Sequence, residues 1–154
     1  MKTVKSSLEF VDYKITSFEY QSSLDSSEKI KYTISIETKM GKLKEKSEIE
    51  FKKNLARIDL NLKLKGKVGK RIPVKITCSI SGIFAADKMI SEEDFMKLCS
   101  TSGVANLLMI LRSIIISFTS QTGNKPIIMP FINLLETYRR NIGLVDKNKK
   151  NREK

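Results

Sequence analysis

Few residue types in this sequence are equipped for acid–base or nucleophilic chemistry. The chain has 154 residues and no histidine, and its two cysteines, Cys78 and Cys99, are far apart and form no Cys-x-x-Cys pair. A zinc site needs clustered Cys and His ligands, and a nucleophilic thiol needs a neighbouring base. The sequence also has no Gly-rich phosphate loop and no nucleophile elbow. We therefore expect reduced, structural cysteines, no catalytic residue, no metal site and no cofactor, and we favour a binding function.

Basic charge is one feature that could bind a partner. The net charge is +12, and residues 39–75 contain 13 Lys and Arg residues against 4 acidic residues, while residues 139–154 contain 7 against 2. Such clustering is compatible with nucleic acid, an anionic membrane surface or an acidic protein. Nucleic-acid binding is the alternative function. It is not favoured, because Tyr32 and Phe51 fall on apolar strand positions and no base-stacking motif is present.

Residues 104–118 predict a helix with apolar side chains on every face. One stripe has helical spacing and consists of Val104, Leu107, Leu108, Leu111, Ile114, Ile115 and Phe118. The opposite face carries Met109, Ile110 and Ile116. A membrane span is not indicated, because it needs roughly 20 uninterrupted apolar residues and this shorter run contains Arg112. A subunit interface is the favoured explanation, and an ordinary core helix is the alternative.

Three segments alternate apolar and polar residues in the manner of strands with one solvated face. They are residues 30–40, 58–65 and 74–80. One-sided alternation is typical of antiparallel sheets. A first strand over residues 8–20 changes parity, which predicts a bulge near Thr16.

The connections between these strands are less regular. We expect a bend or turn at residues 40–42, and no register can be assigned to residues 47–51, which could extend a strand. Gly66 and Gly69 predict a turn, with Pro73 at the start of the last strand because proline donates no ladder hydrogen bond. The Ser-Gly-Ile-Phe segment at residues 81–84 is expected to close that strand.

The second half of the chain is predicted to be helical. Ser91, followed by three acidic residues, is a typical helix N-cap, and Gly103 is expected to break the chain before the long helix. Residues 122–126 should end that helix. The apolar crossover at residues 127–130 should stay extended, because it is bounded by Pro126 and Pro130.

The ends of the chain complete the predicted organisation. A last helix should run from about Phe131 to Gly143, and a basic, disordered tail should occupy residues 144–154. Residues 1–143 are then expected to form a single domain. The first ten residues lack the apolar region of a secretory signal, so we expect a cytoplasmic protein without membrane insertion.

Several short motifs, in this order, resemble the SecB family of protein-export chaperones over roughly residues 10–138. No single motif is specific, and the resemblance rests on their order and spacing. The motifs are Ser17-Phe18-Glu19; Ser81-Gly82-Ile83-Phe84; Ser91-Glu92-Glu93-Asp94; Asn106-Leu107-Leu108 leading to Arg112; and Pro126-Ile127-Ile128-Met129-Pro130-Phe131-Ile132-Asn133 before Tyr138.

The resemblance implies an α+β fold: a SecB-like four-stranded antiparallel sheet followed by a long interface helix, a crossover loop and a C-terminal helix. It also implies a homotetramer, a dimer of dimers, whose apolar grooves hold unfolded polypeptides. The implied oligomer interface consists of Leu107, Met109, Ile110, Arg112, Ile114 and Ile116. The implied client-binding groove consists of Val74, Ile76, Cys78, Ile80, Ile127, Ile128 and Met129, although these residues are equally compatible with plain core. Arg112 is expected to be buried, with a structural role beside a carboxylate or several carbonyls.

The chain departs from the family in charge. SecB proteins are typically acidic and dock the translocase motor on a solvated sheet face, whereas the corresponding docking face here holds Glu19, Lys75 and Thr77. We therefore expect weak or no motor binding, and an acidic partner for this face. Because divergent SecB-like chaperones also serve toxin–antitoxin systems, the predicted function is an ATP-independent holdase, either for preproteins in protein transport and translocation or for a dedicated client such as an antitoxin.

Overall fold

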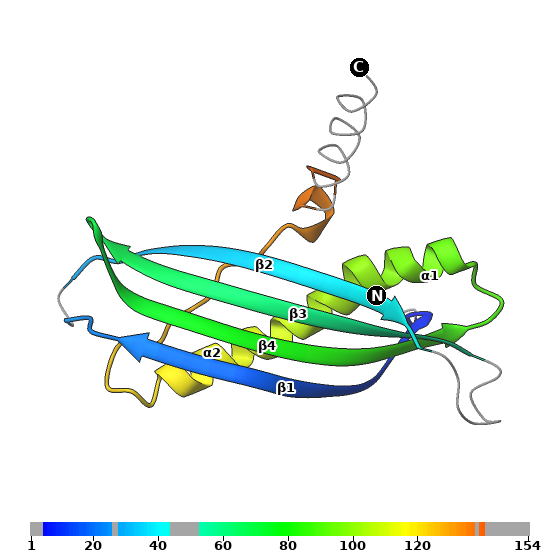
Figure 1. Cartoon of the computed structure of the whole chain (residues 1–154), viewed down its shortest axis with the longest axis horizontal. Coiled ribbons are helices and arrows are strands. Elements are labelled where there is room, and N and C mark those ends of the chain that lie inside the picture. The colour runs from blue at the N-terminus through cyan, green and yellow to red at the C-terminus, as the bar shows by residue number, and fades with distance from the viewer. Residues whose placement is uncertain (1–4, 26–27, 44–52, 138, 141–154) are drawn as a thin grey trace, which may run out of the picture.

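Four long strands form one antiparallel sheet in the computed structural model, which describes residues 5–25, 28–43, 53–137 and 139–140. The strand order across the sheet is β1-β4-β3-β2, and a diagonal helix crosses one face (Figure 1). The strands are β1 (Leu8–Ser22), β2 (Lys31–Lys42), β3 (Lys53–Val68) and β4 (Arg71–Asp87).

The sheet has one dry face and one solvated face, as the alternation predicts. On β3, Ile58, Leu60 and Leu62 are completely buried, while Arg57 and Lys63 between or beside them are exposed. Strand β4 pairs in register with β3, so that the buried side chains of both strands point to the same face. This shared face of the sheet forms one side of the hydrophobic core.

Strand β1 contains the predicted bulge. The pairing with β4 shifts between Ile15 and Ser17, which leaves Thr16 as the extra residue, and a second shift lies between Phe10 and Asp12. An extra residue reverses the parity of the strand. As a result Ile15 and Phe18 both lie over the dry face although their sequence parity differs.

Three predicted strand boundaries are wrong. Residues 40–42 do not form a turn, because β2 continues to Lys42 and pairs with β3 throughout. Gly66 lies inside β3, and the turn is at Gly69 and Lys70. Pro73 is the third residue of β4 and not its first.

Residues 81–84 also do not end β4, which continues to Asp87. Gly82 is required there for close packing: a Cβ atom at this position would lie 2.7 Å from Cδ2 of Leu107 on the covering helix. A glycine inside a strand often marks such an approach and not a stop.

The helices join into one rod of 28 residues from Glu92 to Thr119. Its parts are α1 (Glu92–Leu98), the π-helical segment η2 (Cys99–Gly103) and α2 (Val104–Thr119). Ser91 caps α1 as predicted, since its Oγ accepts a hydrogen bond from the N–H of Asp94 at 3.1 Å. The predicted break at Gly103 is wrong, because that residue is helical (φ −61°, ψ −51°).

Gly103 instead allows the helix to approach the sheet. A Cβ atom there would lie 2.7 Å from Cδ1 of Ile58. Helix α2 then packs its buried stripe on β3 and β4, and the stripe comprises Val104, Leu107, Leu108, Leu111 and Ile115. Within the described residues this rod is long and apolar enough to cross a membrane, with a mean hydropathy of 1.6 over an 18-residue window, but here it lies along a sheet with Arg112 in its second half.

The chain after α2 returns along the sheet as the predicted extended crossover. Residues 125–133 have no regular secondary structure, and a helical turn begins at residue 134, with residues 134–137 and 139–140 helical. This turn starts later than the predicted Phe131, because the side chain of Asn133 acts as its cap: Oδ1 accepts the N–H of Glu136 at 3.1 Å. The predictions for residues 47–51, for Tyr138, for the helix end at residues 142–143 and for the tail at residues 144–154 lie outside the described residues.

Candidate functional site

A buried hydroxyl group fastens the crossover to the end of α2. Thr119 Oγ1 donates to the carbonyl of Ile115 at 2.6 Å and accepts the N–H of Ile127 at 2.9 Å. Thr119 is 1% exposed, so both hydrogen bonds are shielded from water. This anchor determines where the crossover begins. The sequence signal for it is slight: a polar residue four positions after Ile115, on the apolar stripe.

Replacing Thr119 by Val is expected to destabilise the chain by roughly 1–3 kcal/mol, because the buried N–H of Ile127 loses its acceptor. Thr137→Val is the matched control, since the exposed Thr137 hydroxyl also donates to the carbonyl four residues earlier, at 2.8 Å from the oxygen of Asn133. It should change the free energy of unfolding by less than about 0.5 kcal/mol. Urea unfolding of both variants measures the difference, and equal changes would contradict an anchoring role for Thr119.

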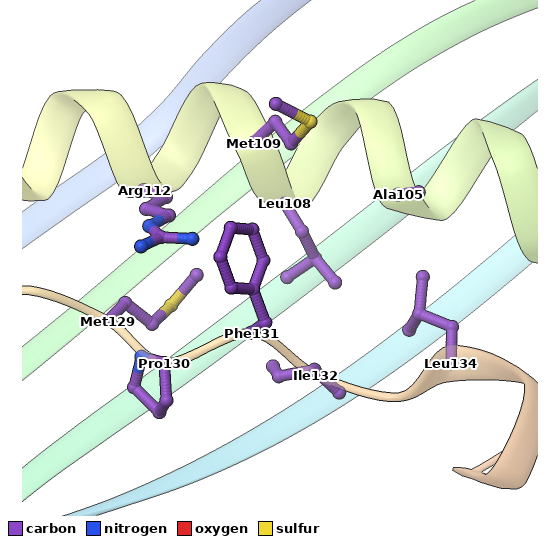
Figure 2. A pocket seen from close by; sticks show the side chains of 9 residues that line it. All are labelled: Ala105, Leu108, Met109, Arg112, Met129, Pro130, Phe131, Ile132 and Leu134. Carbon is purple, nitrogen blue, oxygen red and sulfur yellow. The ribbon is translucent and has the colours of Figure 1, made fainter.

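Two apolar hollows lie where the crossover passes α2 and β2; together we call them the crossover groove. The first has a volume of about 140 Å³ and is lined by Ala105, Leu108, Met109, Arg112, Met129, Pro130, Phe131, Ile132 and Leu134 (Figure 2). The second, of about 110 Å³, is lined by Ile36, Thr38, Met40, Ser100, Val104, Ile132, Leu134 and Thr137. Because the hollows share Ile132 and Leu134, they flank a single stretch of the crossover.

Arg112 and Phe131 form the one charged contact in the wall of the first hollow. The Cζ atom of Arg112 lies 4.0 Å from the centre of the Phe131 ring, and Figure 2 shows the guanidinium beside this ring and Met129. The sequence-based expectation was a buried guanidinium beside a carboxylate or several carbonyls; in this chain the guanidinium is half-buried and rests on an aromatic face through a cation–π contact. Phe131 remains 85% exposed.

The residues predicted to form the client-binding groove are mostly buried. The four on β4, namely Val74, Ile76, Cys78 and Ile80, are at most 1% exposed and belong to the core beneath α2. On the crossover, Ile127 is buried, Met129 is buried in the wall of the first hollow, and Ile128 is 64% exposed. In this structure the four β4 side chains are therefore part of the hydrophobic core. This is the alternative that the sequence left open for them.

The residues predicted for an oligomer interface divide between two sides of α2. Leu107, which the resemblance placed at the interface, is fully buried against the chain's own sheet. Met109 is 63% exposed, and Ile110, Arg112, Ile114 and Ile116 are partly exposed. The outward surface is less apolar than predicted, because Ser113 and Ser117 are also exposed on it.

The predicted docking residues lie on the solvated face, opposite α2. Glu19 pairs with Thr77 across β1 and β4, and Lys75 lies one row further along, opposite Lys65 of β3. Glu19 and Lys75 are exposed and Thr77 is half-buried. The structure thus brings the three residues close together, on the face that the sequence pattern indicated.

Neither cysteine is placed for chemistry. Cys78 and Cys99 are free and buried, and burial raises the pKa of each thiol to about 11. At neutral pH the nucleophilic thiolate is therefore scarce at both positions. Within the described ranges, no cluster of three or more His, Cys, Asp or Glu side chains has an arrangement suited to a metal ion.

Comparison with known proteins identifies the fold of this chain. No family model matches the sequence, and no curated protein matches it. A solved structure described as the Mycobacterium tuberculosis Rv1957 SecB-like chaperone, in complex with a ChAD peptide from the Rv1956 HigA1 antitoxin, aligns with a TM-score of 0.58. The alignment covers 82% of this chain and 91% of that chain, at 12% sequence identity.

The chain has a SecB-like fold. The predicted α+β architecture, a four-stranded antiparallel sheet followed by a long helix, is therefore confirmed. A protein of unknown function from Streptococcus agalactiae aligns with a TM-score of 0.46 and 14% identity, over 80% of this chain and 97% of that one.

Proposed function

We propose that this chain is a SecB-like holdase chaperone, which binds unfolded polypeptides in the crossover groove without ATP. The observation that carries the proposal is the groove itself: an apolar hollow between α2 and the crossover, with Phe131 85% exposed in its wall. Exposed apolar surface of this kind marks an interaction site in a soluble protein. The fold supports the proposal, since a protein that shares it is described as a chaperone bound to an antitoxin peptide.

The composition of the groove suits many clients. Met109 and Met129 line the first hollow and Met40 lines the second, and unbranched thioether side chains repack around different apolar partners. Ile132 and Leu134 add aliphatic surface to both hollows. We expect client segments rich in apolar residues, from preproteins or from a dedicated client such as an antitoxin, and we expect the protein to act in the cytoplasm.

Assembly into a homotetramer, as a dimer of dimers, is part of the same proposal. Helix α2 covers the sheet with one side, while its other side lies on the outside of this chain (Figure 1). Met109 is 63% exposed on it, whereas Phe118, although 42% exposed, lies on the side that faces the sheet, where its ring packs edge-on against Phe18 and Tyr20 of β1. A second copy of the helix would remove this apolar surface from water, at a gain of roughly 25 cal/mol for each Å² buried.

Aggregation of a chemically unfolded client, followed by light scattering without ATP, tests the holdase function. We expect the chain to delay aggregation, and we expect Leu134→Asp to weaken the effect severalfold because it places a charge in both hollows. Ile72→Asp is the control: Ile72 is 38% exposed on β4 and lines neither hollow. No delay by the parent chain, or equal loss in both variants, would contradict the proposal.

A further inference from the structure

One end of the solvated sheet face carries four lysines in two directly opposed pairs. Lys31 of β2 lies opposite Lys67 of β3, and Lys65 of β3 lies opposite Lys75 of β4. All four side chains are exposed. We call these four residues the lysine end. Directly opposed like charges destabilise a sheet, so the pairs are costly to the fold itself.

No acidic side chain of the described residues neutralises the lysine end: none lies within ion-pairing distance of its four ammonium groups. The nearest ion pairs belong to Lys63, which lies 3.8 Å from a carboxylate oxygen of Glu37, and to Arg71, which pairs with Glu28. The cluster is therefore an uncompensated positive patch.

The rest of the solvated face is balanced in charge. Over the next four rows of the sheet it carries four basic residues, namely Lys14, Lys39, Arg57 and Lys63, and four acidic residues, namely Asp12, Glu19, Glu37 and Asp59. The excess positive charge is thus confined to the end of the sheet beside the Gly69 turn. A ligand that exploits this excess must be small enough to stay there.

We propose that the lysine end is a docking site for a short acidic segment of a partner protein, with carboxylates at alternate positions. Alternate residues of a strand lie roughly 7 Å apart and neighbouring strands roughly 5 Å apart, so the four lysines occupy a patch about 10 Å across. Acidic side chains on one side of an extended peptide repeat at the same interval as Lys65 and Lys67. Four ammonium groups on one patch also give fast, salt-sensitive association.

The balanced remainder of the face disfavours larger anions. A nucleic-acid duplex carries a charge for about every 1.7 Å of its axis and extends beyond the patch, where Glu19, Glu37 and Asp59 would repel it. An anionic membrane would cover the same carboxylates. The aromatic side chains Phe18, Tyr20 and Tyr32 pack against the core, so none of them is available on this face to stack nucleobases.

This docking site is separate from the proposed chaperone function, because the lysine end and the crossover groove lie on opposite faces of the sheet. Lys65→Gln/Lys75→Gln should therefore leave the delay of client aggregation unchanged. Loss of that delay together with loss of peptide binding would overturn the assignment to two surfaces.

Fluorescence anisotropy with a labelled ten-residue peptide of alternating Glu and Ser tests the docking site on the full chain. We expect Lys65→Gln/Lys75→Gln to weaken binding at least tenfold. The control Lys14→Gln/Lys39→Gln removes the same net charge from the balanced region and should change binding less than twofold. A peptide of alternating Gln and Ser should not bind, and raising the salt from 50 to 300 mM should weaken binding of the acidic peptide.

Three results would overturn the proposal. The first is an equal loss of binding in both double variants, which would reflect net charge alone. The second is tighter binding of a 20-base-pair DNA duplex or of anionic lipid vesicles, lost in Lys65→Gln/Lys75→Gln. The third is a lower urea midpoint for Lys65→Gln/Lys75→Gln, because removal of an opposed lysine pair should leave the midpoint unchanged or raise it.

Discussion

Leu107→Ala is expected to lower the free energy of unfolding by roughly 2–5 kcal/mol, because it opens a cavity between α2 and β4. The leucine is fully buried, and its Cδ atoms lie directly over Gly82, where the helix and the sheet are closest. Urea denaturation followed by circular dichroism measures the change.

Met89→Ala is the control for this substitution. Met89 precedes α1 and is 94% exposed, so its truncation should change the free energy of unfolding by less than about 0.5 kcal/mol. If Leu107→Ala were as mild as Met89→Ala, α2 would have to pack on the sheet through a different stripe.

Met109→Asp is expected to dissociate the proposed tetramer. The side chain is 63% exposed on the outer side of α2, so the substitution does not disturb the core of one chain. In the assembly it would bury an unpaired carboxylate in each subunit, which costs roughly 3–5 kcal/mol where no partner is available. Sedimentation velocity at micromolar concentration should show a tetramer for the parent and smaller species for the variant.

Met89→Asp adds the same charge at an exposed turn and should leave the sedimentation of the parent unchanged. A parent chain that sediments as a monomer, or a Met109→Asp variant that stays tetrameric, would contradict an interface on the outer side of α2.

The sheet could be predicted from the sequence because its signal is local. The alternation of Ile58, Leu60 and Leu62 with polar residues identifies β3 within a few residues, and the parity change in β1 identifies the bulge at Thr16. The resemblance to SecB proteins then supplied the order of sheet, helix and crossover, which the structural comparison confirms.

Structural features that depend on contacts between residues far apart in the sequence could not be predicted in this way. Gly82 and Gly103 have the signature of stops, but each is small because a side chain far away in sequence, Leu107 or Ile58, occupies the space beside it. Similarly, α2 is apolar on several sides, so the sequence alone does not determine which side packs on the sheet. In the structure Leu107 faces the sheet and Met109 faces outward.

Most of the groove was missed for the same reason, and Met129 is the one predicted groove residue that lines a hollow. The second hollow combines Met40 of β2, Ser100 of η2 and Leu134 after the crossover, which are up to 94 positions apart and share no motif. The β4 residues expected to line a groove are apolar and alternate regularly, and this pattern describes a core strand equally well.

Site-specific photo-crosslinking tests client capture at the crossover groove most directly. Phe131 is replaced by a benzophenone amino acid, the full chain is mixed with a chemically unfolded client, and crosslinked product is compared with that from the same amino acid at Lys75 on the opposite face of the sheet. We predict efficient crosslinking from position 131 to the unfolded client, none to the same client when folded, and little from position 75. Equal crosslinking from both positions, or none from position 131, would contradict the proposed holdase groove.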